Sequence, residues 1–422
     1  MSRRALKLSS VLVVGVVGWA AWGVPAAGAE RADRPPINIQ SNDQFDAEHG
    51  VRSGRGTAED PYVISGWRVG SIRIENTDRH VVIHNNTVTG QMVLNWIGDR
   101  AHVHGNEVGD LRVNQNKPRT GMPTSGVIAH NTFGVVGQLR HWDGIFERNV
   151  VGSPDKLGAR AVNFDGFNGA RFRNNSIFGY MDARLHGHHH SSGFEEASHQ
   201  HAGGHEGHAS VDHTQRYHRV SITNNTIRTT AAYALAYLDT NHAANDRTAA
   251  SEQEEALRLP HVHHTRVMFA GNRLMGAGIL VNVFNAPDAR KHIRTAPGIV
   301  ELRDNEITLG PDGFWSFRDL FGIEVRQAQD LDLVIDGNEV RGQEDDGLFA
   351  ALDGRDRNAG IFVHDLDKAD VSITRNKVLE RTIGVRAESF TDSVRWVIRD
   401  LKTQGVDQRV YADESVKDSP AA

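Results

Sequence analysis

One short pattern of apolar and polar positions recurs ten times along the chain. In each copy, small or apolar residues lie five and three positions before an asparagine and an apolar residue lies two after it, as in Val81-Ile83-Asn86-Val88. Two-residue spacing is strand periodicity, in which alternate side chains share a face. The other copies are centred on Asn106, Asn131, Asn149, Asn175, Asn225, Asn272, Asn305, Asn338 and Asn376. The pattern predicts a short strand before each asparagine.

The asparagine indicates how the copies pack. Asparagine tolerates the kinked backbone of a turn, and stacked asparagine amides can bond to one another in a ladder. Short self-similar strands without regular helices between them are typical of a solenoid. We therefore expect an all-β fold, a single-stranded parallel β-helix with loop insertions.

The spacing between asparagines shows where the repeat is interrupted. Successive asparagines are 20, 25, 18, 26, 50, 47, 33, 33 and 38 residues apart. About 20–25 residues make one rung of three short strands. The larger values therefore indicate one rung with an insertion, or two rungs of which one is degenerate. Rungs stack about 4.8 Å apart, so a dozen would make a rod of roughly 50–60 Å.

Residues 1–29 predict a cleaved signal peptide. Basic residues Arg3, Arg4 and Lys7 precede an apolar run, and Ala27-Gly28-Ala29 is a small-residue cleavage site. The run is short for a membrane span. We expect a periplasmic or secreted protein with no membrane span after cleavage, exported by either the general or the twin-arginine route. Residues 30–411 are expected to form the β-helix and residues 412–422 a flexible tail.

Composition excludes several classes of site and partner. The chain has no cysteine, so it has neither disulfides nor thiolate metal ligands. Cleavage after Ala29 removes three basic residues and takes the formal charge from −6 to −9. A mildly acidic exported chain is a poor candidate for nucleic-acid binding.

The segment Gly54-Arg-Gly56-Thr57-Ala58-Glu-Asp60-Pro61-Tyr62-Val63-Ile64-Ser-Gly66-Trp67 resembles the first-rung motif of a known group. The group is the NosD-like periplasmic proteins, associated with copper-site assembly, within the pectin-lyase-like superfamily of right-handed parallel β-helices. The resemblance implies a right-handed β-helix whose first rung is covered by Tyr62 and Trp67. It implies no catalytic set, because the chain lacks the Gly-His-Gly and Arg-Ile-Lys motifs of polygalacturonase-like relatives. Catalytic residues stay unknown.

Histidines concentrate in three insertions. Ten of the 23 histidines lie between His186 and His218. The insertions span about 186–218, 239–264 and 284–298, and each follows a strand that begins shortly after a ladder asparagine. Equivalent slots of a solenoid lie on one side. The sequence therefore places fifteen histidines on one face.

This concentration predicts a transition-metal site. Neutral imidazole is a good ligand for zinc and copper, and His-x-His in extended chain points both rings the same way. The alternative interpretation is an inert, solvated loop, because a histidine-rich tract is a compositional signal. We expect zinc or copper as the cofactor, and the predicted ligands are His186, His188, His190, His199, His201, His261, His263 and His264.

The alternative function is a carbohydrate-active enzyme, a lyase or hydrolase acting on an acidic polysaccharide. Its candidate residues lie at outward positions of later strands: Glu324, Arg326, Phe362, His364, Arg386 and Glu388, with Asp182, Arg184 and Asp239 upstream. Trp142, Phe314 and Trp315 are candidates for stacking on sugar rings. Each has a simpler interpretation, since a Glu/Arg pair on one strand is usually a solvated ion pair. Whether the protein is an enzyme stays open, as does a third possibility, a non-catalytic binding rod.

Overall fold

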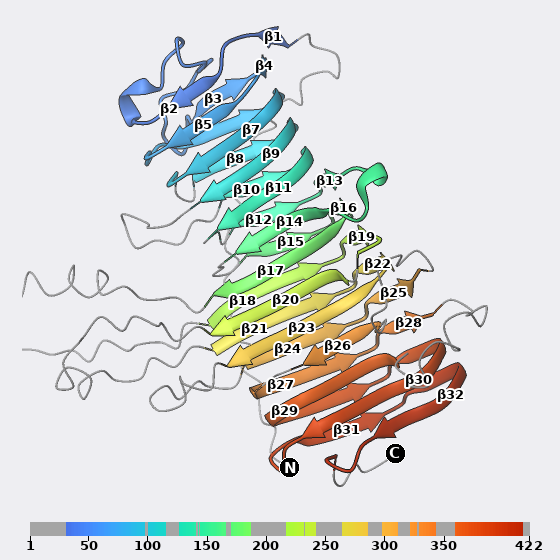
Figure 1. The fold of residues 1–422 in the computed structure, drawn as a ribbon. Coiled ribbons are helices and arrows are strands. Elements are labelled where there is room, and N and C mark those ends of the chain that lie inside the picture. Colours follow the sequence, from blue (N-terminus) through green and yellow to red (C-terminus); the bar gives the residue numbers. More distant parts are fainter. Residues whose placement is uncertain are drawn as a thin grey trace, which may run out of the picture.

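The computed structural model is a rod of stacked parallel strands (Figure 1). It describes residues 31–97, 100–114, 126–140, 142, 144–165, 170–186, 217–231, 233–241, 264–285, 298–310, 321–326, 329–342 and 359–416. All strand pairings in these ranges are parallel, and each strand pairs with the equivalent strands of the rungs before and after it. The fold is therefore a parallel β-helix, and the predicted fold class is confirmed.

Each rung contributes to three columns of strands, which we name by their position relative to the ladder asparagine. Column B precedes the asparagine, column A1 follows it, and column A2 comes last, before the chain passes to the next rung. Column B contains β3 (Tyr62–Ser65), β6 (Val81–His84), β8 (Ala101–His104), β10 (Val127–Ala129), β12 (Ile145–Glu147), β15 (Arg171–Arg173), β18 (Tyr217–Thr223), β21 (His264–Ala270), β24 (Gly298–Arg303), β27 (Gln329–Asp336) and β31 (Arg395–Arg399).

The other two columns are built from separate strands in the middle of the rod and from longer, continuous strands towards its ends. Column A1 contains β1 (Ala32–Asp33), β4 (Trp67–Val69), β13 (Val150–Gly152), β16 (Ser176–Phe178), β19 (Thr226–Arg228), β22 (Arg273–Gly276), β25 (Glu306–Leu309) and β28 (Glu339–Arg341). Column A2 contains β2 (Ile37–Ile39), β5 (Ile72–Glu75), β14 (Arg160–Asp165), β17 (Tyr180–His186), β20 (Tyr233–Asn241), β23 (Gly278–Asn285) and β26 (Ile323–Arg326).

Six long strands belong to two columns, and two 3₁₀ turns complete the described elements. The strands are β7 (Thr87–Asn95), β9 (Glu107–Asn114), β11 (Thr132–Arg140), β30 (Lys377–Phe390) and β32 (Lys402–Ala412), which join A1 to A2, and β29 (Ala359–Thr374), which joins A2 to B. The turns are η1 (Asn42–Gln44) and η3 (Pro154–Lys156). No helix among the described residues is long and apolar enough to cross a membrane.

The asparagine ladder is continuous from Asn86 to Asn376. Each side-chain amide donates to the Oδ1 of the next ladder asparagine, as from Asn86 to Asn106 at 3.0 Å, and each Oδ1 also accepts the backbone N–H of the preceding asparagine. Asn175 bonds directly to Asn225 at 2.8 Å across the longest gap in sequence. Each long interval between ladder asparagines therefore holds one rung with an insertion, and the degenerate second rung is excluded.

The turn beside the ladder differs from expectation. The left-handed backbone lies at the residue before each ladder asparagine, with φ of 53° at Asn85 and Arg148 and 63° at Gly105. The ladder asparagine itself is not in this conformation, so placing the kink there was wrong. It is selected for its two-sided amide, because it must donate and accept along the rod axis while it is 0–3% exposed.

The core fills the space between the three columns. Phe133, Phe146 and Phe172 stack on successive rungs, with centroids 5.9 and 5.3 Å apart. Trp142, predicted as a possible sugar platform, is 2% exposed and packs edge-on against Phe146 and Phe172. The prediction for Trp142 was wrong, because its indole fills the core at a corner. Phe314 and Trp315 lie outside the described residues.

The first rung is closed by the aromatic residues of the predicted motif. Tyr62 stacks on Phe45 at 4.5 Å. Trp67 lies under the guanidinium of Arg52 at 3.3 Å from the ring centroid, and its indole N–H donates to a backbone carbonyl. Both aromatic rings pack against the core. They shield the outermost apolar layer at this end of the rod from water, as a terminal rung of a solenoid requires.

Candidate functional site

The three histidine-containing insertions leave the rod from neighbouring strands. β17, β20 and β23 pair in parallel, with His186 beside Thr240 and Thr240 beside Phe284. The chain returns on β18, β21 and β24, which also pair in parallel, with Tyr217 beside His264. The attachment points of the insertions are therefore adjacent on three consecutive rungs (Figure 1).

The predicted ligands fall at or beyond the ends of these strands. His186 is the last residue of β17 and His264 the first of β21. Within the ranges that the structure describes, no group of three or more histidine, aspartate or glutamate side chains is arranged to hold a metal ion. The ligand set stays a prediction. The remaining predicted ligands lie outside the described residues: His188, His190, His199, His201, His261 and His263.

A second set of polar residues lies on the outer face of column A2, in the rungs after the insertions. Register places Glu324 beside Phe362, and Phe362 beside Arg386. Two positions further along the same strands, the residues in register are Asn282, Arg326, His364 and Glu388. The expected stacking of these outward residues on successive rungs is confirmed.

Glu324 is the centre of this set. It is 4% exposed, and its Oε2 accepts a hydrogen bond of 2.8 Å from the Tyr233 hydroxyl. Its Oε1 lies 3.3 Å from Nε2 of His364 and 3.5 Å from a guanidinium nitrogen of Arg326. Glu324 and Arg326 do form an ion pair, as the simpler interpretation has it, but the pair is not solvated as expected, because the Glu324 carboxylate is enclosed. We call Tyr233, Glu324, Arg326 and His364 the Glu324 cluster.

Opposing effects act on the Glu324 carboxyl. Burial on its own would raise its pKa, but the hydrogen bonds from His364 and Tyr233, with the charges of Arg326 and His364, hold the pKa below its ordinary value. Glu324 is therefore ionised at neutral pH. In that state it can hold a proton donor or a cationic group in place, but it has no proton to give.

His364 lies between two carboxylates. Its Nε2 faces Glu324, and its Nδ1 lies 2.9 Å from a carboxylate oxygen of Asp365. The ring stacks on Phe362 at 4.2 Å between centroids, and its side chain is 18% exposed. An imidazole fixed on both nitrogens and in partial contact with solvent is positioned to transfer a proton.

Two polar atoms, one in the cluster and one beside it, have no hydrogen-bond partner among the described residues. Asn282 is 8% exposed, and its Oδ1 is buried without a hydrogen bond; the same holds for Nε of Arg326, the residue beside it on β26. A buried polar group without a partner costs about 1–3 kcal/mol. Such groups are rare in folded proteins, and each requires an explanation.

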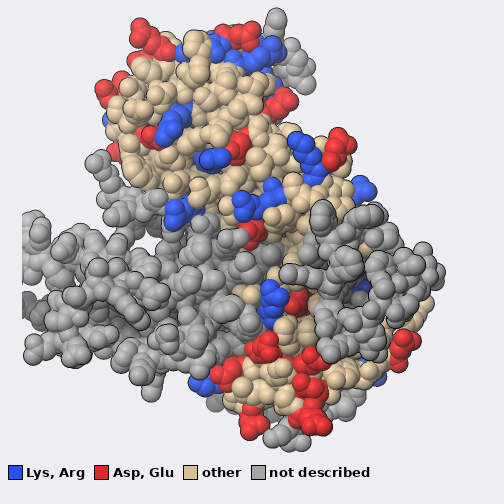
Figure 2. Space-filling view, in the orientation of Figure 1, with Lys and Arg blue, Asp and Glu red and all other residues tan. Residues whose placement is uncertain are grey.

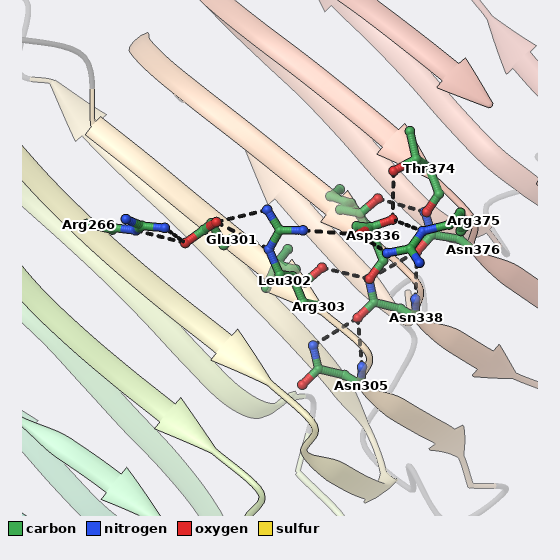
Figure 3. A network of polar contacts seen from close by, with 11 residues as sticks. Arg266, Glu301, Leu302, Arg303, Asn305, Asp336, Asn338, Thr374, Arg375 and Asn376 are labelled. Carbon is green, nitrogen blue, oxygen red and sulfur yellow. Dashed lines mark hydrogen bonds and ion pairs between the residues drawn. The ribbon is translucent and has the colours of Figure 1, made fainter. Parts of the chain in front are cut away.

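The outer face of column B shows what a saturated polar network looks like on this rod (Figure 3). Glu301 accepts hydrogen bonds from Arg266 at 2.9 Å and from Arg303 at 2.9 Å. Arg303 continues to Asp336 at 3.1 Å, and Asp336 also accepts from Arg375 at 2.9 Å. Both carboxylates are 5% exposed and each has two guanidinium partners. This network is complete without a ligand, whereas the Glu324 cluster is not.

Separation along the rod limits the hydrolytic chemistry of the cluster. Asp182 is paired with Arg160 at 3.6 Å and is 5% exposed. It lies on β17, three strand spacings from Glu324 on β26, or about 14 Å at ~4.8 Å per spacing. Glycosidases hold their two carboxyl groups about 5–9.5 Å apart. Asp182 and Glu324 therefore cannot form such a pair. Arg184 and Asp239 have side chains outside the description.

Tyr233, Asn282 and Asp365 were not among the residues predicted from the sequence. A signal for Tyr233 was present, because its partners on the following rungs are Gly278 and then Gly322. A Cβ at Gly278 would lie 2.1 Å from the Gly322 carbonyl oxygen. When a large aromatic residue is followed by glycines at the equivalent positions of the next rungs, its side chain has room to extend over the neighbouring strand. No comparable signal marked Asn282 or Asp365.

Comparison with protein-family models, with curated proteins and with solved structures finds no match.

Proposed function

We propose that this chain is an exported β-helix protein that binds zinc or copper through its clustered histidine-rich insertions and acts in non-catalytic metal handling. The observation that supports this proposal is the pairing of β17 with β20 and of β20 with β23, and likewise of β18 with β21 and of β21 with β24. It tethers both ends of all three insertions to consecutive rungs. Side chains tethered in this way meet at a high effective concentration.

The composition of the insertions supports a borderline transition metal. Zinc and copper(II) accept neutral imidazole, whereas calcium and magnesium prefer oxygen shells. The His-x-His elements are His188/His190, His199/His201 and His261/His263. The first-rung motif, which resembles the NosD-like proteins, is consistent with metal handling at the cell envelope. The NosD-like relationship itself is part of this proposal.

Calorimetric titration of the untagged mature chain, residues 30–422, with Zn²⁺ and with Cu²⁺ tests the proposal. We expect a fixed stoichiometry that falls when residues 188–216 are replaced by a short Gly/Ser linker, and falls further with His261→Asn and His263→Asn. Binding should weaken below about pH 6, because ligand histidines must be neutral.

The matched control is the double variant His84→Gln/His104→Gln, which removes two histidines from the outer face of column B and leaves the insertions intact. Its stoichiometry should equal that of the wild type. Unchanged stoichiometry in the loop-replaced variant with both His261 and His263 substituted would overturn the proposal.

A second candidate function is carbohydrate chemistry at the Glu324 cluster, and a specific observation favours it. An ionised, buried carboxylate holds an imidazole and a phenol, beside two unpartnered polar atoms, on a solvent-facing strand column. The test is an assay of soluble polysaccharides for reducing ends and for unsaturated products, with and without zinc. Turnover lost in His364→Gln would support a catalytic cluster, and no turnover on any polymer would overturn an enzymatic one.

A further inference from the structure

The outer face of column A2 carries compensated charge. Arg160 pairs with Asp182 at 3.6 Å, Arg326 with Glu324 at 3.5 Å, and Arg386 with Glu388 at 2.5 Å. Each of these arginines therefore has a carboxylate beside it on the same face. An incoming anion would have to displace a carboxylate of the protein itself, and would be repelled by Glu324 as it approached.

The molecular surface agrees with this balance. In the view of Figure 2, basic and acidic side chains are interspersed over the upper rungs, and acidic side chains gather over the lower ones. No extended basic face is visible in that view among the described residues. A linear polyanion binds best to a surface with a sustained positive potential.

The unpartnered atoms specify a different chemistry. Oδ1 of Asn282 can only accept a hydrogen bond, and Nε–H of Arg326 can only donate one. The two residues are partners across parallel strands, so their side chains leave the same face about 4.8 Å apart. A hydroxyl group both donates and accepts, so a ligand with neighbouring hydroxyls satisfies both atoms at once. A carboxylate can only accept, so at this position it would satisfy Arg326 and leave Asn282 without a donor. The two atoms therefore match hydroxyl groups, and the compensated charge of the face favours a saccharide that carries no carboxylate.

We propose that the face formed by Asn282, Arg326 and His364 binds a neutral, hydroxyl-rich saccharide. The proposal rests on the second candidate function, that this face meets carbohydrate, and it changes the expected ligand from an acidic polymer to a neutral one. The partial exposure of Arg326, at 35% of its side chain, and of His364, at 18%, leaves the outer edge of the site open to solvent.

Affinity electrophoresis and calorimetry on the full mature chain test the proposal. The neutral probes are soluble β-glucan, xylan and galactomannan, and the acidic probes are polygalacturonate and alginate. We expect at least one neutral polymer to bind and neither acidic polymer to bind more tightly. Asn282→Leu and Arg326→Lys should each weaken that binding at least tenfold, the second because lysine keeps the charge and lacks Nε–H.

Stability separates a binding role from a structural one. Asn282→Leu removes a buried amide oxygen that has no partner, so its melting temperature should equal or exceed that of the wild type while binding is lost. Arg171→Lys, an exposed substitution on column B, is the control and should change neither property. Tighter binding of an acidic polymer, or unchanged binding in Asn282→Leu, would overturn the neutral-ligand proposal alone. Absence of binding to every polymer would overturn both it and the carbohydrate candidate.

Discussion

Tyr233 donates a hydrogen bond of 2.8 Å to Glu324 although the whole of β23 separates their strands. The Tyr233 side chain therefore spans a rung, where its partner in register is Gly278. Parallel strands in a solenoid are tied by backbone bonds only to their immediate neighbours. This side-chain bond links β20 to β26 directly, and it fixes the orientation of the carboxylate that holds His364.

Replacing Tyr233 by phenylalanine should destabilise the rod by about 1–2 kcal/mol, because Glu324 loses a donor while it stays buried. The folded-state pKa of Glu324 is depressed, so its contribution to stability is present above the unfolded-state pKa and is lost as pH falls. Without the phenol the depression is smaller. The difference in unfolding free energy between wild type and variant should therefore shrink as pH falls below about 4.

Denaturant unfolding between pH 3 and pH 7 measures this effect. Tyr180→Phe is the matched control, since Tyr180 begins β17 in the same column and has no hydrogen bond to the Glu324 cluster among the described residues. A Tyr233→Phe penalty that is the same at every pH would show that the phenol does not act through the Glu324 carboxylate.

The outer face of column B near the first rungs carries stacked histidines whose titration should affect stability. The rings of His84 and His104 stack at 5.1 Å. Burial lowers the pKa of His104 to about 4, with further lowering by His84, His102 and His130. Burial also lowers the pKa of His84 and of His102. The charged groups that lower the pKa values of His102 and His104 are other histidines, so protonation of one ring disfavours protonation of the next.

The direction in which stability changes with pH follows from proton linkage. A histidine has a pKa of about 6.5 in an unfolded chain, so between about pH 6.5 and pH 4 the unfolded state binds protons that the folded His104 does not. Stability should fall across that window by about 1–2 kcal/mol, a figure discounted for the partial exposure of the rings. Hydrogen exchange of β6 and β8 at pH 7 and pH 5 measures the loss. The variant His84→Gln/His104→Gln should show a flatter dependence on pH, and an unchanged slope would contradict the assignment.

The fold could be predicted from the sequence because the same pattern of residues recurs in each rung of a solenoid. Ten asparagines at one offset set both the strands and their stacking, and the ladder bonds from Asn86 to Asn376 are the physical form of that repeat. The position of the left-handed residue in the turn was predicted less accurately. Left-handed backbone is easiest for glycine and asparagine, yet Arg148 and His130 adopt it. Local propensity is overridden there by the two-sided bonding of the neighbouring asparagine.

The candidate site was only partly predictable, because its residues meet across rungs. Outward alternation placed Glu324 and Arg326 on one strand beside Phe362 and His364 on the next, as the strand pairing has them. Burial was not predictable, since an outward position on an isolated strand predicts exposure, whereas Glu324 is 4% exposed. Trp142 shows the reverse error, because an aromatic residue at a corner can turn inward. Such outcomes depend on neighbouring rungs, which the local pattern does not contain.

The ladder itself should tolerate little change in the middle of the rod. Asn225 is 1% exposed, and its Oδ1 accepts from both the amide and the backbone N–H of Asn175. Asn225→Ala leaves the backbone N–H of Asn175 buried without an acceptor and leaves the Asn175 amide with the Phe146 carbonyl as its remaining acceptor. It also opens a small cavity, so the total cost should be about 3 kcal/mol. Denaturant unfolding measures the loss, with Asn38→Ala on the exposed side of β2 as the control. A loss below about 1 kcal/mol would mean that backbone bonds alone set the register.

Two arginines with the same strained backbone should respond in opposite directions to glycine. Arg148 and Arg375 have φ of 53° and 54°. Left-handed backbone costs a non-glycine residue about 1–2 kcal/mol, and Arg148 makes no side-chain hydrogen bond or ion pair in the part of the chain that the structure describes. Arg148→Gly should therefore stabilise the protein by about 0.5–1 kcal/mol, after the larger entropy of glycine in the unfolded chain is subtracted.

Arg375→Gly gains the same relief but loses more than it gains. The Arg375 guanidinium donates to Asp336, which is 5% exposed, and holds the pKa of that carboxyl below its ordinary value. Removing it leaves the buried carboxylate with Arg303 as its remaining guanidinium partner, so the net effect of Arg375→Gly should be destabilising. Thermal unfolding of the two variants side by side measures the contrast. If both variants are stabilised, the contacts of Arg375 with Asp336 contribute less to stability than the relief of backbone strain. If both are destabilised, the strain relieved at Arg148 is smaller than the entropy cost of glycine.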